Sequence, residues 1–159
     1  MAQEKFIVCL RGKAKQGKSE SIITLMKLLL KKPKTKLECY EPQLSGEEFL
    51  KQYTDGWDIC GAIYYNGKKI GINSAGDVPR DVRRQLKKLA EKNCDIIFCA
   101  SRSKGDTVKE VKKIAKRYNA LIWTSPYTAD TPLLKGVDSE QIHQCLNEKK
   151  AKHLAEFIG

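Results

Sequence analysis

The sequence has no long uninterrupted apolar run, and its first residues, MAQEKFIVCLRG, lack an extended hydrophobic core followed by a small-residue cleavage site. A membrane-spanning helix needs roughly 18 or more consecutive apolar residues, and a secretory signal needs both of the missing features. These absences argue against a membrane span and against secretion. We therefore expect a cytoplasmic protein with no membrane partner.

Histidine is scarce, and none of the six cysteines belongs to a C-x-x-C pair, so the sequence lacks the ligand spacing of a zinc site. Most of the cysteines lie in apolar runs, which predicts buried, reduced thiols rather than disulfides. The two histidines, His143 and His153, fall on one predicted helix, where we expect an ordinary surface or packing role.

Aromatic residues amount to only 8% of the chain, and 19 acidic residues stand against 30 lysines and arginines, which gives a formal charge of +11. A positive charge of this size favours polyanionic partners such as nucleotides and nucleic acids. However, the lysines are spread along the whole chain, and few aromatic residues lie among them to stack on bases. Nucleic acid is therefore left open as a partner, and no protein partner is indicated.

The sequence does contain enough apolar material for one core, because 41% of its 159 residues are hydrophobic. We therefore interpret residues 1–159 as a single domain. Short apolar runs predict strands, and apolar residues at helical spacing predict helices. The predicted strands are 6–10, 36–40, 59–65, 69–73, 96–100 and 121–124, and the predicted helices are 19–31, 46–53, 82–90, 108–118 and 138–158.

This alternation is typical of a three-layer α/β domain with a mostly parallel sheet, because right-handed crossovers place helices on both faces. Asn66-Gly67 joins two of the predicted strands and favours a tight turn, so we expect one antiparallel hairpin at the edge of the sheet. Ligands bind at the carboxyl ends of parallel strands. The loops after Leu10, Asn73, Ala100 and Thr124 should therefore face one site.

One loop carries the strongest functional signal. It matches the pattern G-x-x-x-x-G-K-[ST] at every fixed position, and it lies between a predicted strand and a predicted helix. Its residues are Gly12, Lys13, Ala14, Lys15, Gln16, Gly17, Lys18 and Ser19. The loop resembles the Walker A loop of P-loop nucleoside triphosphatases. The structural alternative is a glycine-rich connector that leads into a solvated, lysine-rich helix start.

The resemblance implies a P-loop domain that binds a nucleoside triphosphate with Mg²⁺, and ATP is favoured over GTP. Backbone N–H groups of such a loop converge on phosphate oxygens, and the following helix points the positive end of its dipole at the same anion. Lys18 would reach the β and γ phosphates, and Ser19 would offer its hydroxyl to Mg²⁺. The implied nucleotide contacts run from Gly12 through Ser19 to Glu20, although Lys13 and Lys15 could equally face solvent.

P-loop proteins usually carry a further acidic residue, at the end of another strand, that orients Mg²⁺. Asp77 is the candidate for this role, although it follows the predicted strand 69–73 by several residues. The structural alternative is that Asp77 caps the helix that begins near Pro79.

The stretch Asn73-Ser74-Ala75-Gly76 also resembles the D-x-x-G motif of small GTPases, with asparagine in the place of the acid. Asparagine lacks the charge that the Mg²⁺ shell needs. Ser103-Lys104-Gly105-Asp106 only approximates the N-K-x-D motif that reads guanine, and helix-capping chemistry around Thr107 explains it equally well. We therefore do not predict a guanine preference.

Arginines near the same edge are candidates for phosphate contacts. Arg102 follows a predicted strand and could stabilise charge on a transferring phosphoryl group, or it could be an ordinary surface residue. Arg80, Arg83 and Arg84 could form a phosphate clamp or a solvated helix face. Three functions stay open: an NTPase, which is our first hypothesis; a small kinase with an unknown acceptor; and a non-catalytic nucleotide-responsive or nucleic-acid-binding module.

Overall fold

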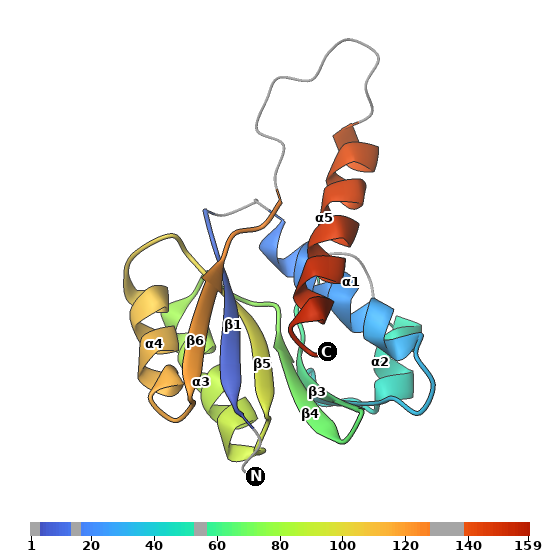
Figure 1. Ribbon diagram of the computed structural model, residues 1–159, viewed down its shortest axis with the longest axis horizontal. Helices are drawn as coiled ribbons and strands as arrows, with labels where there is room; N and C mark the ends of the chain where they lie inside the picture. The colour runs from blue at the N-terminus through green and yellow to red at the C-terminus, as the bar shows by residue number, and fades with distance from the viewer. Residues whose placement is uncertain (1–3, 14–16, 53–56, 128–138) are drawn as a thin grey trace.

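The computed structural model describes residues 4–13, 17–52, 57–127 and 139–159, and they form a layered α/β structure (Figure 1). The strands are β1 (Phe6–Arg11), β2 (Lys36–Glu41), β3 (Cys60–Tyr65), β4 (Lys68–Asn73), β5 (Ile96–Ser101) and β6 (Ala120–Thr124). The helices are α1 (Lys18–Leu30), α2 (Gly46–Gln52), α3 (Pro79–Glu91), α4 (Asp106–Ala115) and α5 (Ser139–Glu156). These bounds agree with the predicted elements to within a few residues.

The six strands form one sheet in the order β2-β3-β4-β5-β1-β6. The pairs β4/β5, β5/β1 and β1/β6 are parallel, so the prediction of a mostly parallel sheet is confirmed. The prediction that the hairpin lies at the edge is wrong. β2 pairs antiparallel with β3, with Leu37 opposite Ile63, and therefore covers the outer side of the β3/β4 hairpin. The reason is that β3 is apolar and buried from Cys60 to Ile63, which suits an interior strand.

Helices cover both faces of the sheet, as the alternation predicted. Alternate residues of β1 point to opposite faces. Val8 and Leu10 belong to a core cluster with residues of α1, α2 and α5, whereas Ile7 and Cys9 belong to a second cluster with residues of α3 and α4. Figure 1 shows α1 and α5 side by side on one face of the sheet, with α3 and α4 on the other. Burial of each large aliphatic side chain contributes about 1.5–3 kcal/mol.

The cysteines behave as their apolar surroundings predict. All six are free thiols, and five of them are buried, with Cys145 on α5 as the exposed one. Burial raises the pKa of the Cys60 thiol to about 12, so that thiol stays protonated at neutral pH. Cys60 therefore does not form the reactive thiolate at neutral pH. Among the described residues, no helix is both long and apolar enough to cross a membrane.

The fold brings several strand ends to one edge of the sheet. β1, β4, β5 and β6 run in the same direction, so their carboxyl ends lie together, and the backbone N–H of Gly12 donates to the carbonyl of Ser101 over 3.2 Å. The loops that follow β1 and β5 are thus joined directly. This edge is the place to look for the predicted site.

Candidate functional site

The loop after β1 leads directly into α1, as the motif requires. Gly12 is buried at the end of the strand, and α1 begins at Lys18. Gly17 precedes the helix with φ at 81°, a left-handed conformation that glycine adopts without steric cost. Ala14, Lys15 and Gln16, which the sequence assigns to nucleotide contact, lie outside the described residues. Lys13 and Glu20, assigned to the same contact, are exposed.

Lys18 is the centre of the arrangement. Its side chain is only 5% exposed, and its ammonium group donates to the carbonyl oxygens of Gly12 and Ser101, each over 2.9 Å, and to Asp77 Oδ1 over 3.2 Å. An ammonium group has three N–H donors, and these three acceptors match them. Lys18 therefore links the loop after β1, the end of β5 and the loop after β4.

Asp77 and Arg102 form the exposed side of this network. Arg102 Nε lies 3.0 Å from Asp77 Oδ1, and the two side chains are 46% and 51% exposed. The capping alternative for Asp77 does not describe the structure, because α3 begins after Val78 with no side-chain cap. An ion pair this exposed contributes at most about 1 kcal/mol to stability. Asp77 and Arg102 can therefore change partners at low cost.

Ser19 lies in the first turn of α1, and its hydroxyl donates to the backbone carbonyl of Ser74 over 2.8 Å. A hydroxyl that donates one hydrogen bond keeps lone pairs for a cation. The Ser19 hydroxyl and the Asp77 carboxylate are the hard oxygen ligands that Mg²⁺ prefers, so the residues present fit that ion. No group of three His, Cys, Asp or Glu side chains suited to a metal occurs in the described ranges, but Mg²⁺ keeps several waters and needs few protein ligands.

The end of β4 holds no carboxylate. Asn73 is fully buried, and neither polar atom of its side chain has a hydrogen-bond partner among the described residues. The chain then passes close to β5, since a Cβ on Gly76 would lie 2.6 Å from the carbonyl carbon of Ala100. Only glycine permits this approach, which leads the chain to Asp77.

Two side chains hold the segment after β5 through hydrogen bonds to its backbone. The N–H of Arg102 donates to Thr107 Oγ1 over 2.9 Å, and Arg11 Nε donates to the carbonyl of Ser103 over 2.6 Å. The hydroxyl of Thr107 thus organises the turn before α4, but the helix begins after Gly105 with no side-chain cap, so the capping interpretation is not confirmed. Asp106 forms an exposed ion pair with Lys109 within α4.

Two of the three arginines on α3 are paired with carboxylates. Arg84 Nε lies 2.7 Å from Glu41 Oε1, and Arg83 Nε lies 3.4 Å from Glu110 Oε2. The hydrogen bond from Arg84 holds the pKa of the Glu41 carboxyl below its usual range. These contacts favour the solvated-face interpretation of this helix over the phosphate clamp.

Sequence reasoning missed two residues that lie beside the site. Asp58 accepts a hydrogen bond from the hydroxyl of Ser74 over 3.0 Å; its position before an antiparallel strand could have placed it at this edge. Asn147 of α5 accepts from the hydroxyl of Ser21 over 3.3 Å, and a Cβ on Gly17 would lie 2.7 Å from its Oδ1. No local signal in the sequence relates Asn147 to a loop about 130 residues earlier.

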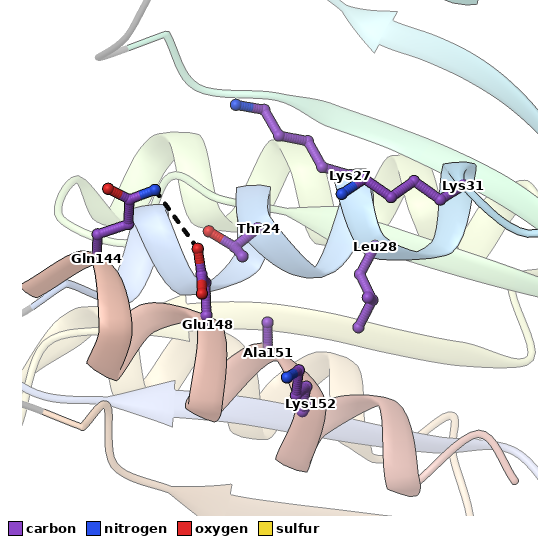
Figure 2. Close-up of a pocket in the computed structure, with 8 residues that line it drawn as sticks. All are labelled: Thr24, Lys27, Leu28, Lys31, Gln144, Glu148, Ala151 and Lys152. Carbon is purple, nitrogen blue, oxygen red and sulfur yellow. Dashed lines mark hydrogen bonds between the residues drawn. The ribbon is translucent and has the colours of Figure 1, made fainter. Parts of the chain in front are cut away.

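A separate pocket of about 400 Å³ lies between α1 and α5 (Figure 2). Most of its lining residues are polar or charged, and they include a glutamine that donates to a glutamate one turn away. The lining residues are Thr24, Lys27, Leu28, Lys31, Gln144, Glu148, Ala151 and Lys152. None of the contacts of Lys18 or Ser19 is among them, so this pocket is distinct from the candidate site.

Comparison of the chain with protein-family models, with curated proteins and with solved structures gave no match. The case for a function therefore rests on the loop sequence and on the geometry around Lys18.

Proposed function

We propose that the protein binds a nucleoside triphosphate together with Mg²⁺, holds its phosphates against the loop after β1 and the first turn of α1, and hydrolyses it. ATP is the nucleotide we expect, because the motifs that read guanine are incomplete. The observation that carries this proposal is the position of the Lys18 ammonium, which is nearly buried at the carboxyl edge of a parallel sheet beside the loop that matches the phosphate-binding pattern.

The contacts of Lys18 suggest how phosphate would enter. Two of its acceptors are backbone carbonyls and the third is the half-exposed Asp77. A phosphate oxygen could replace the carboxylate, and the same exchange would release Arg102 toward the phosphate, where its guanidinium can make two parallel hydrogen bonds. Both cations would then stabilise the charge that develops during phosphoryl transfer.

Mg²⁺ would be held by the Ser19 hydroxyl with Asp77 in or near its shell. When bound, the ion neutralises charge on the phosphate oxygens. The hydrogen bond from the Ser19 hydroxyl to the carbonyl of Ser74 supports this role, because it fixes the side chain and leaves its oxygen lone pairs available. The role of Asp77 is thus twofold in this proposal: it balances Lys18 without nucleotide and faces the cation with it.

A thermal-shift panel tests the proposal, because a ligand that binds the native state raises its melting temperature. ATP, GTP, ADP and GDP are each added at millimolar concentration, with Mg²⁺ and with EDTA, to the wild type and to Lys18→Ala. We expect stabilisation of the wild type by triphosphates with Mg²⁺, and its loss in Lys18→Ala. Wild-type protein that no nucleotide stabilises would overturn the proposal.

Product analysis then separates hydrolysis from transfer. Release of inorganic phosphate with no acceptor present indicates an NTPase, whereas phosphate that appears only on an added acceptor indicates the kinase alternative. Binding of nucleic acid that falls steeply with salt and persists in Lys18→Ala would favour the third function, a nucleic-acid module.

A further inference from the structure

Ser74 connects Ser19 to a carboxylate that the loop motif does not include. Ser74 is fully buried, and its carbonyl accepts from the Ser19 hydroxyl while its own hydroxyl donates to Asp58 Oδ1. The two distances are 2.8 and 3.0 Å. One buried residue therefore joins the hydroxyl proposed for Mg²⁺ to an exposed acid that precedes β3.

The position of Ser74 is fixed by the backbone of its neighbours. Its N–H donates to the carbonyl of Ile59 over 3.0 Å, and its hydroxyl accepts from the N–H of Ile59 over 2.8 Å. These bonds tie the loop after β4 to the residue that follows Asp58. The backbone of Asp58 is thus held at the carboxyl edge by hydrogen bonds of the next residue, Ile59, to Ser74.

A second carboxylate would complete the charge of this site. Asn73, at the end of β4, is neutral and fully buried, which leaves Asp77 as the one carboxylate that the proposed function assigns to the cation. The bond from Ser74 uses one oxygen of Asp58, and an ionised carboxylate has about four lone-pair positions. We infer that Asp58, positioned by Ser74, supplies the negative charge of the Mg²⁺ shell that Asn73 cannot supply. Asp58 would act through the waters that Mg²⁺ retains.

This inference rests on the proposed function, and its test uses a metal readout that does not depend on turnover. The full-length protein is saturated with a non-hydrolysable ATP analogue and titrated with Mg²⁺ while the melting temperature is followed. Binding of Mn²⁺ to the same complex is measured in parallel by electron paramagnetic resonance. The variant is Asp58→Asn, which keeps an oxygen for the Ser74 hydroxyl and removes the charge. Glu91→Gln, at an exposed position at the far end of α3, is the matched control.

We expect Asp58→Asn to raise the Mg²⁺ concentration at half-maximal stabilisation, and the Kd for Mn²⁺, by about 10-fold or more, the usual effect of losing a group that supports a metal. Its affinity for the analogue in EDTA should be equal to or tighter than that of the wild type. Ser74→Ala should show the same loss in the metal titration, because it releases Asp58, and Glu91→Gln should show none.

Two outcomes would overturn the inference, and they differ. If the wild type binds the analogue and Asp58→Asn needs the same Mg²⁺ and Mn²⁺ concentrations within twofold, Asp58 has no role at the cation and the proposed function stands. If the wild type binds neither the analogue nor ATP, the proposed function fails and the inference fails with it. If Ser74→Ala does not fold, Asp58→Asn is sufficient for the test, because its side chain is exposed and nearly isosteric with that of the wild type.

Discussion

Two nearly buried lysines lie at the same edge of the sheet, and their surroundings differ. Lys18 is 5% exposed and donates to two backbone carbonyls and to Asp77. Lys150 of α5 is 1% exposed, donates to Thr124 Oγ1 and to His153 Nδ1, and lies 4.9 Å from the centre of the Tyr127 ring. None of these three partners of Lys150 carries a carboxylate.

The two lysines differ in whether a carboxylate is among the partners of the ammonium group. The charge of Lys18 is balanced by a carboxylate that is half exposed, which a phosphate group would replace in the proposed function. Lys150 has no carboxylate among these partners, and burial lowers its pKa to about 8. Thr124 ends β6 and Lys150 belongs to α5, so this lysine connects the helix to the edge strand. We therefore propose a binding role for Lys18 and a structural role for Lys150.

The largest expected difference between the two lysines is in nucleotide affinity. Lys18→Ala should weaken ATP binding roughly 100-fold, because it removes charge-assisted hydrogen bonds to phosphate. Lys150→Met should change it by less than about threefold, since Lys150 contributes no bond to phosphate in this account. Titration calorimetry with Mg²⁺ measures both. Equal losses of ATP affinity in the two variants would contradict the proposed difference between Lys18 and Lys150.

The second prediction concerns stability and pH. Between a folded pKa of about 8 and the ordinary value of 10.5 for Lys150, the unfolded chain holds a proton that the folded chain has released. The free energy of unfolding contributed by this group therefore rises with pH across that window, and the full cost of burying the charge applies below it. Urea unfolding of the wild type and of Lys150→Met at pH 7 and pH 10 should show the wild type gaining roughly 1–3 kcal/mol relative to the variant.

Other groups titrate in the same range, but they are shared by both proteins and cancel in that difference. Cys60 and Cys94, for example, are buried thiols whose pKa values rise to about 12. A wild type that loses stability relative to Lys150→Met as pH rises would contradict a lowered pKa for Lys150 in the folded state.

The third prediction concerns the contact between Gly17, which precedes Lys18, and α5, which carries Lys150. Gly17→Ala combines a positive φ with a Cβ only 2.7 Å from Asn147 Oδ1, and Asn147 lies one turn before Lys150. We expect a loss of about 1–2 kcal/mol in the free energy of unfolding, with weaker ATP binding. Gly67→Ala is the control, because Gly67 also has a positive φ but no atom near its Cβ position. Combining Gly17→Ala with Asn147→Ala separates the contact from the strain.

The smallest expected effect is that of Asp77→Asn. Both members of the pair between Asp77 and Arg102 are about half exposed, so stability should change by less than about 1 kcal/mol. Affinity for ADP in EDTA should rise about threefold, because a negative charge near the phosphates is removed. A loss of more than about 2 kcal/mol would show instead that Asp77 is a structural clamp for Lys18.

Much of the fold could be predicted because the local signals agree with one another. Helical spacing in α1 and the Asn-Gly turn between β3 and β4 were sufficient to place those elements. The position of β2 was missed, since strand order depends on which edges pair in three dimensions and not on any local pattern.

At the candidate site, Lys18 and Ser19, which the motif singles out, lie in the first turn of α1, and Asp77 and Arg102 lie at the same edge of the sheet. Asn147 could not be assigned from sequence, because its proximity to Ser21 arises from packing between segments far apart along the chain, and a single polar residue carries no periodic signal. Asp58 was missed although its position before the antiparallel strand β3 could have placed it at this edge.

Backbone amide chemical shifts report whether phosphate binds at the start of α1, as proposed. The ¹⁵N-labelled protein is titrated with ADP and Mg²⁺ while each assigned amide is followed. We expect the largest shifts at Gly12, Gly17, Lys18 and Ser19, with little change at Lys150 and His153. Saturating shifts centred on α5 around Lys150, or no saturable shifts at millimolar ADP, would contradict phosphate binding at the start of α1.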